Sequence, residues 1–314
     1  MFNEGRKNDF LKQLEVDKTP YLSLFRVTEP YEVAKNRDLA EFTVEEFTQV
    51  LADGLGLTQS SLRMSKQRIN KYLAWCRSQS YPTTVAGNIG VNPDKSKAIH
   101  QNMVGSPEDL SLRMDKIFHD RTLATVDCLY RCYLWMLFMG FEKEEPELVK
   151  TAEVDLASFT INHEHVRYDI PPTALVDFMN AANAQEFIHG KSIKKGNNTI
   201  GRRIESPYLL RGLRTDRLSY DTVQRQVTNL QKKKCVTGDK LIPKQIRISG
   251  FLWRAYQVER AGGLPQLDPL IEDVFSGTSF VAAPDDKPAR DYRRYLQIKY
   301  SQDYNAWKRA FNLT

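Results

Sequence analysis

A helix predicted over residues 61–77 carries the side chains whose types best fit contact with a nucleic acid. At 100° per residue its apolar residues fall on one face, and a cationic and amide set falls on the other. That set is Arg63, Gln67, Asn70 and Lys71. Such side chains hydrogen-bond base edges or hold phosphates. The same pattern is typical of an ordinary solvated face, so both interpretations stay open.

Cationic charge is concentrated in the stretch from Phe187 to Arg260. This stretch holds 17 lysines and arginines against 5 acidic residues, an excess of 12, whereas the whole chain has a net charge of +6. A surface that tracks a phosphate backbone needs this concentration, because each neutralised phosphate releases counterions. We expect the phosphate contacts of this stretch to be Lys191, Lys194, Lys195, Arg202, Arg203, Lys244 and Arg247.

Other chemistries are poorly represented in the sequence. His163 and His165 form an H-x-H without a third ligand, which is weak evidence for a metal. The chain has no GxxxxGK[ST] loop, no GxGxxG after a strand and no GxSxG elbow. Cys128 and Cys132 lie four apart in a helical run, which favours reduced core thiols over a zinc or redox site. We therefore expect neither a metal nor a cofactor.

The elements that must position these side chains divide into two predicted domains. A chain of 314 residues exceeds the usual size of a single domain. Residues 82–97 hold two prolines and two glycines and break all periodicity, which is typical of a linker. The boundary predicted there gives a helical first domain over residues 1–92 and a second domain over residues 93–314.

In the first domain, residues 1–40 predict a short helix or an arm that packs onto the rest of the domain. Thr43 and Glu46 have the spacing of a capping box, which starts a helix that ends near Gly54.

In the second domain, the pattern predicts mainly helices with a small β-sheet, an α+β fold. The elements are helices over 107–117 and 123–139, strands over 158–161 and 166–170 around a turn at 162–165, a helix from Thr173 through Phe187, a mobile loop over 190–201, a helix over 221–232, and a helix that begins at Pro243 and stops at Gly262-Gly263.

This order of features resembles the tyrosine recombinases, the phage integrase family, from about Glu41 to Tyr304. The family's TGLR-x-x-E motif corresponds to Met139–Glu145, and its HxLRHT motif corresponds to Lys244–Ser249. The resemblance implies a two-domain clamp. Residues 1–92 would form a core-binding (SAM-like) DNA-binding domain, and residues 93–314 would form a domain of the catalytic type.

The resemblance also marks where this chain departs from the family's active site. Glu142 stands where the first arginine is expected, Lys244 replaces the leading histidine, and the second arginine is kept as Arg247. The catalytic lysine belongs on a hairpin turn, where this chain has only Asn162–His165. The nearest match to the LGH motif is Val274–Gly277. The family's nucleophilic tyrosine corresponds to Tyr292 or Tyr295, with Tyr300 and Tyr304 nearby.

These departures bear directly on catalysis. In the family, two arginines stabilise the charge that develops when a tyrosine attacks a phosphodiester. A carboxylate at position 142 would instead repel the phosphate by about 4 kcal/mol at 4 Å and an effective dielectric near 20. We therefore expect no enzyme activity and a vestigial site at Glu142, Lys244, Arg247, Tyr292 and Tyr295. We also expect Glu142 to pair with Arg247 or Lys244, the alternative being a solvent-facing Glu142.

Within the superfamily, the pattern most resembles the recombinase-like lysogeny repressors of SPβ-type Bacillus phages. The match rests on PYLSLF at Pro20–Phe25, on FTVEEF, on YLAWC and on the degraded active site. It implies a sequence-specific transcriptional repressor of a temperate phage or prophage that binds double-stranded operator DNA. Homo-oligomerisation is left open. The alternatives are a divergent but active site-specific recombinase and an interaction protein with an incidental basic face.

The sequence predicts no contact with a membrane. Met1–Gln13 is studded with charge, unlike a signal peptide. The longest apolar run, Cys128–Phe141, contains Arg131 and is shorter than the roughly 18 residues that a membrane span needs. We expect a cytoplasmic protein of a bacterial host cell.

Overall fold

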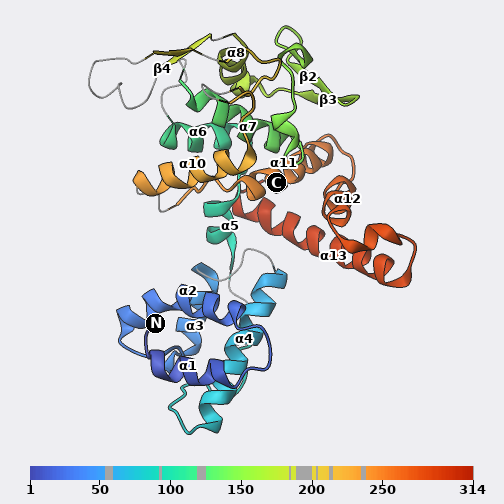
Figure 1. Cartoon of the computed structure of the whole chain (residues 1–314). Helices are drawn as coiled ribbons and strands as arrows, with labels where there is room; N and C mark the ends of the chain where they lie inside the picture. Colours follow the sequence, from blue (N-terminus) through green and yellow to red (C-terminus); the bar gives the residue numbers. More distant parts are fainter. Residues whose placement is uncertain are drawn as a thin grey trace. The chain divides into compact units, whose positions relative to one another are not determined.

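The chain separates into two compact units (Figure 1). Unit 1 comprises residues 1–99 and 298–314, and unit 2 comprises residues 100–297. This grouping places residues 298–314 with the first unit, whereas the sequence-based division counts them in the second domain; that division stays a prediction. The computed structural model describes residues 1–53, 59–91, 94–118, 125–183, 185–188, 200–202, 204–211, 215–234 and 238–313.

Unit 1 is helical. The predicted capping box is confirmed at the start of its third helix: the Thr43 N–H donates to Glu46 Oε2 at 2.9 Å, and the Glu46 N–H donates to Thr43 Oγ1 at 3.3 Å. Residues 1–40, for which the sequence predicts a short helix or an arm, form two helices followed by a 3-10 turn. The elements are α1 (Glu4–Lys12), α2 (Thr19–Lys35), the 3-10 turn η1 (Leu39–Glu41), α3 (Val44–Asp53), α4 (Gln59–Ser78) and the start of α5 (Ser96–Asn102).

The core of unit 1 lies beneath one face of α4. Ile69, Tyr72 and Leu73 of this helix are fully buried, and the Tyr72 ring centroid lies 5.2 Å from that of Phe10 on α1. The α4 residues of the predicted apolar face are therefore in the core, as their spacing indicated. The core also holds an ion pair between Lys7 and Glu32, 2.5 Å apart and wholly inaccessible to solvent. Burial raises the pKa of Glu32, and the Lys7 charge opposes that rise.

Unit 2 is built around α7 (Asp127–Met139), which contacts α8 (Leu175–Asn183), α10 (Tyr220–Lys233) and α11 (Pro243–Arg260). Nearly every α7 side chain is buried, because its apolar residues cover the whole circumference of the helix. Among the described residues, unit 2 also contains α6 (Pro107–Ile117), α12 (Asp268–Ser276) and α13 (Lys287–Ala310), whose last part belongs to unit 1. Short 3-10 turns lie at Glu145–Glu147 (η2), Thr151–Glu153 (η3), Pro172–Ala174 (η4) and Ser279–Ala282 (η5).

Unit 2 also carries a small antiparallel sheet in the order β1-β2-β3, from Val154–Asp155, Thr160–His163 and Val166–Asp169. The hairpin turn is only Glu164-His165, with φ of 46° and 68°, which suits a tight two-residue turn. Asn162 and His163 lie in β2, so the expected turn at 162–165 is two residues too long. The fold is mainly α with a small β-sheet, as the sequence predicts.

A second expectation for this region is wrong. The helix predicted to run from Thr173 through Phe187 begins as η4, continues as α8 and ends at Asn183. The residues that come after it form β4 (Glu186–Ile188), which pairs antiparallel with β5 (Ile200–Arg202). Phe187 and Ile188 favour a strand, and pairing with β5 satisfies their backbone groups outside the helix. Most of the loop predicted over 190–201 lies outside the described residues.

The described residues contain neither a membrane span nor a cluster suited to a metal ion. None of their helices is long and apolar enough to cross a bilayer. No group of three or more histidine, cysteine, aspartate or glutamate side chains there has an arrangement that could hold a metal ion.

Candidate functional site

The two motif-like segments of unit 2 meet where α7 crosses α11. At the crossing, a Cβ added to Gly250 would lie 1.8 Å from the Phe138 carbonyl oxygen, so only glycine allows the two backbones to approach this closely. Gly140 ends α7 with a φ of 111°, a left-handed conformation that glycine adopts without strain. The Arg254 guanidinium lies over this glycine, where an added Cβ would be 2.7 Å from Nη2. The glycines therefore set the geometry of the site.

Arg247, the retained arginine of the HxLRHT-like segment, projects from α11 into this crossing. Its Nε donates to the Phe141 carbonyl at 2.6 Å, and its Nη1 forms an ion pair with Asp273 of α12. Its guanidinium carbon lies 5.4 Å from the Phe251 ring centroid. The charge of Arg247 is thus balanced inside the protein.

The predicted pairing of Glu142 with Arg247 or Lys244 is wrong. Within the described chain, neither the Glu142 carboxylate nor the Lys244 ammonium lies within 4 Å of an opposite charge, and both side chains are exposed. Asp273 occupies the position of counter-ion to Arg247 instead. Glu142 lies just beyond the end of α7, where its backbone N–H donates to Glu145 Oε2, and its side chain faces solvent as the alternative interpretation expected.

Arg254 is a site residue that the motif-like segments did not identify. Its Nη1 donates to the Phe138 carbonyl at 2.8 Å, and its guanidinium carbon lies 4.7 Å from the Phe251 ring centroid. No carboxylate forms an ion pair with it among the residues that the structure describes. Burial, followed by the neighbouring charge of Arg247, lowers the pKa of Arg254 to about 10, so it stays cationic at neutral pH. Its spacing of seven from Arg247, two helical turns, was the available signal.

The β-hairpin covers the other side of the crossing. The Tyr168 ring of β3 stacks on Phe141 with centroids 3.9 Å apart, and His163 of β2 lies 5.9 Å from the same ring. His163 Nδ1 also lies 3.1 Å from Glu153 Oε2. Burial raises the pKa of Tyr168, so its hydroxyl stays protonated. The hairpin turn, Glu164-His165, presents no lysine.

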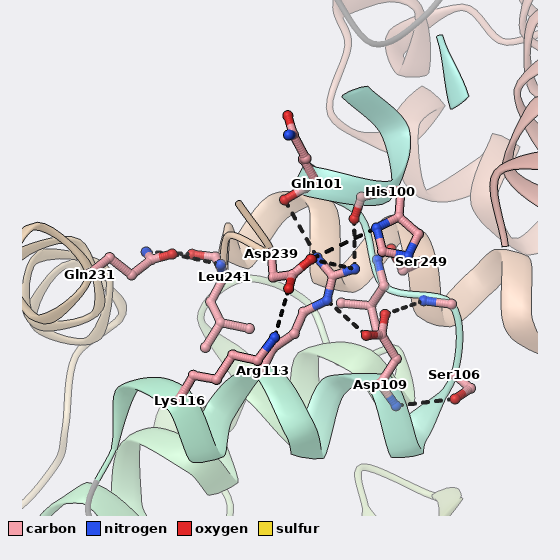
Figure 2. A network of polar contacts seen from close by, with 12 residues as sticks. His100, Gln101, Ser106, Asp109, Arg113, Lys116, Gln231, Asp239, Leu241 and Ser249 are labelled. Atoms are coloured by element: carbon pink, nitrogen blue, oxygen red, sulfur yellow. Dashed lines mark hydrogen bonds and ion pairs between the residues drawn. The ribbon is translucent and has the colours of Figure 1, made fainter. Parts of the chain in front are cut away.

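A polar network holds the segment that leads into α11 (Figure 2). Asp239 accepts from Lys116 Nζ of α6 at 2.7 Å, and this hydrogen bond is the main cause that lowers the pKa of Asp239. The fully buried Arg113 lies in the same network, with Nε donating to Asp109 at 3.0 Å and Nη2 to the His100 carbonyl at 2.6 Å. The network therefore joins α6 to the residues just before α11.

Two further contacts fix the start of α11. The Gln231 side chain of α10 binds both backbone groups of Leu241, accepting from its N–H at 2.8 Å and donating to its carbonyl at 3.1 Å. Ser249 Oγ accepts from the Val104 N–H at 2.9 Å. Pro243 stands in the first turn of α11, and Gly262 lies just past its end with a φ of 89°, both as predicted. Lys244 is thus an exposed cation on a well-anchored first turn.

The candidate tyrosines lie in an aromatic cluster. Tyr292 is half-buried, and its ring centroid lies 5.1 Å from that of Phe280 and 5.9 Å from that of Tyr295. Tyr295 is 43% exposed. Tyr300 and Tyr304 are buried in the part of α13 that belongs to unit 1. The cluster packs on Phe275 of α12, so Tyr292 has a structural role in unit 2.

In unit 1, the predicted polar face of α4 is accessible at three of its four positions. Arg63, Gln67 and Lys71 are exposed. Asn70 is half-buried, and its Oδ1 accepts from the Ile89 N–H at 2.8 Å, so it also fixes the segment after α4. Among the predicted phosphate contacts of unit 2, Arg202 on β5 and Lys244 are exposed. Lys191, Lys194, Lys195 and Arg203 lie outside the described residues.

Comparison with known proteins adds a match to a family model and similarity to solved structures. Residues 1–78 match the family model described as "MrpR, N-terminal core-binding domain". No curated protein matches the chain. A solved structure titled "Crystal structure of XerA recombinase" is similar with a TM-score of 0.37 and 14% sequence identity, over 95% of this chain and 98% of that chain.

Proposed function

We propose that this protein is a sequence-specific DNA-binding repressor, of a temperate phage or prophage, built on a recombinase-like chain that no longer cuts DNA. The observation that carries the proposal is the exposed face of α4 formed by Arg63, Gln67 and Lys71. This face lies within the 78 residues that match a core-binding domain. A helix of this kind fits the major groove, where glutamine and arginine discriminate base edges and lysine holds phosphate.

The state of the crossing supports a role without catalysis. An enzyme that stabilises a pentavalent phosphate needs cationic donors directed at it before the reaction. Here Arg247 is engaged by Asp273 and by the Phe141 carbonyl, and an exposed carboxylate, Glu142, stands next to Phe141 in the sequence. A protein that only occupies DNA needs neither a cleared phosphate site nor a nucleophile. The repressor proposal therefore fits these contacts better than the recombinase alternative.

The test begins with the DNA that the full-length protein recovers from a phage-bearing bacterial genome. On a duplex containing the recovered site, we expect Gln67→Ala to relax the preference at one base pair by about 1–3 kcal/mol, roughly 5- to 150-fold in Kd. Lys71→Ala should weaken recovered and scrambled duplexes alike, because a phosphate contact carries no sequence information. Fluorescence anisotropy on both duplexes measures the two effects.

The matched control is Lys12→Ala, which removes an exposed lysine from α1 of the same unit. Its Kd should equal that of the wild type. In a separate salt series, the affinity of the wild type should fall steeply between about 50 and 200 mM salt, a range over which a protein with about 6–10 phosphate contacts loses affinity by a factor of roughly 10³–10⁵. A Gln67→Ala/Lys71→Ala double variant with wild-type affinity and preference would remove α4 from the interface. Failure to recover any specific DNA would refute the function itself.

A further inference from the structure

Unit 2 contains a cavity of about 660 Å³ between the start of α6, strand β3 with the prolines that come after it, and the second half of α11. Its walls combine aromatic and cationic groups. Tyr168 and Trp253 supply rings, and the cationic lining residues are Arg167, Arg254 and Arg260. The acidic lining residues are Glu108 and Asp169, both exposed. A volume of this size lies within the usual range for small-molecule sites.

Arg254 gives the cavity its chemical character. It is half-buried, whereas Arg167 and Arg260 are exposed. Within the described part of the chain it makes one hydrogen bond, to the Phe138 carbonyl. A guanidinium has five N–H donors in a planar fork, so most of its donor capacity stays unused. Partial removal of a cation from water without a carboxylate beside it is unfavourable, and an oxyanion in the cavity would offset that cost.

The remaining arginines fit the same ligand. Arg167 projects from the exposed hairpin, and its Nε lies 3.5 Å from Asp169, an exposed pair of the kind that contributes little. Arg260 is exposed at the end of α11. Both can therefore turn toward an anion at the mouth of the cavity without breaking a buried contact. The rings of Tyr168 and Trp253, both half-buried, offer apolar faces for the rest of the ligand.

We propose that this cavity is a binding site for a small ligand that joins an oxyanion, a phosphate or a carboxylate, to a planar apolar ring. Arg254 binds the oxyanion from inside the cavity, Arg167 and Arg260 complete its charge balance, and the ring packs between Tyr168 and Trp253. A nucleotide of a DNA strand has the same chemistry, so the test distinguishes a free ligand from DNA. The site is independent of the proposed repressor function.

The probe is phenylphosphonate, which carries both required parts, titrated into the full-length protein by isothermal calorimetry. We expect saturable binding to one site, at least about 10-fold tighter than that of inorganic phosphate or of benzyl alcohol. Arg167→Gln and Arg260→Gln should each weaken binding by about 10-fold or more, since each removes a charge-assisted hydrogen bond to the oxyanion. Arg290→Gln, an exposed arginine of α13 outside the cavity lining, is the matched control and should leave Kd unchanged.

Two measurements keep the result independent of folding and of DNA. Each variant must unfold at the wild-type temperature, which the exposure of Arg167 and Arg260 leads us to expect. Phenylphosphonate affinity should also be unchanged when the protein is saturated with duplex. No saturable heat, equal affinity for inorganic phosphate, or wild-type affinity in both arginine variants would overturn the proposal. Displacement of the probe by duplex would assign the cavity to DNA and overturn the proposal that it binds a free small ligand.

Discussion

At the scale of single residues, the charge of Arg247 is satisfied within unit 2. One donor is taken by the Phe141 carbonyl and another by the Asp273 carboxylate, whose side chain is only 15% exposed. A phosphate that approached Arg247 would have to displace Asp273 or bind beside its negative charge. Asp273, a residue outside both motif-like segments, therefore determines how much of the Arg247 charge would be available to a phosphate.

This leads to a prediction for Asp273→Asn. Removing the carboxylate charge should release Arg247 for a phosphate, so duplex affinity at low salt should increase and the salt slope should steepen by about one counterion. Glu272→Gln is the matched control. Glu272 lies on the same helix as Asp273, and the substitution breaks its ion pair with Arg293 of α13. Anisotropy titrations over a salt series measure both. Equal slopes in the two variants would show that Arg247 does not face DNA.

At the scale of elements, the α7–α11 crossing depends on one missing side chain. The Gly250 Cα lies so close to the Phe138 carbonyl that an alanine methyl would overlap it. Both Arg247 and Arg254 project from the turns of α11 on either side of Gly250, and both donate to carbonyls at the end of α7. A shift of α11 away from α7 would therefore disturb both guanidinium positions together.

We predict that Gly250→Ala destabilises unit 2 by at least about 2 kcal/mol, because overpacking against a backbone carbonyl exceeds the gain of about 0.5–1 kcal/mol from replacing a helical glycine. Gly238→Ala is the control, since its new methyl would meet only Gln101 side-chain atoms at 3.9 Å or more. Urea unfolding of both variants measures the difference. A Gly250→Ala protein as stable as the Gly238→Ala protein would contradict the role assigned to Gly250 at the crossing.

The same elements show how far the sequence could predict the molecule. Local signals predicted the structure correctly where residues adjacent in the sequence determine the conformation. Examples are the Thr43–Glu46 capping box, the start of α11 at Pro243 and the apolar face of α4. They failed where a distant partner decides it. The pairing of Arg247 with Asp273 depends on how α12 packs, and the end of α8 at Asn183 depends on the pairing of β4 with β5. No spacing in the sequence encodes either contact.

At the scale of the whole molecule, the positions that the resemblance assigns to strand cleavage carry other residue types or lie in structural contacts. The hairpin turn holds Glu164-His165 without a lysine, the first turn of α11 presents Lys244 where the resemblance expects histidine, and Tyr292 is packed in an aromatic cluster. Loss of several groups that act as a unit is not reversed by restoring one of them. The proposed absence of catalysis thus rests on the whole set rather than on Glu142 alone.

One double variant should separate binding from cutting. A Glu142→Arg/Asp273→Asn protein should have two arginines free for a phosphate, and we expect it to bind duplex more tightly than the wild type. We propose that it still forms no covalent adduct with a nicked suicide duplex. The hairpin turn Glu164-His165 presents no lysine, and Lys244 stands where the resemblance expects the histidine that moves a proton. Denaturing gels of the wild type and the double variant on the recovered DNA measure this directly, with a known active recombinase on its own site as the positive control. An adduct from the wild type would overturn the non-catalytic proposal. An adduct from the double variant alone would show instead that the repulsion at position 142 and the neutralised Arg247 were what prevented cleavage.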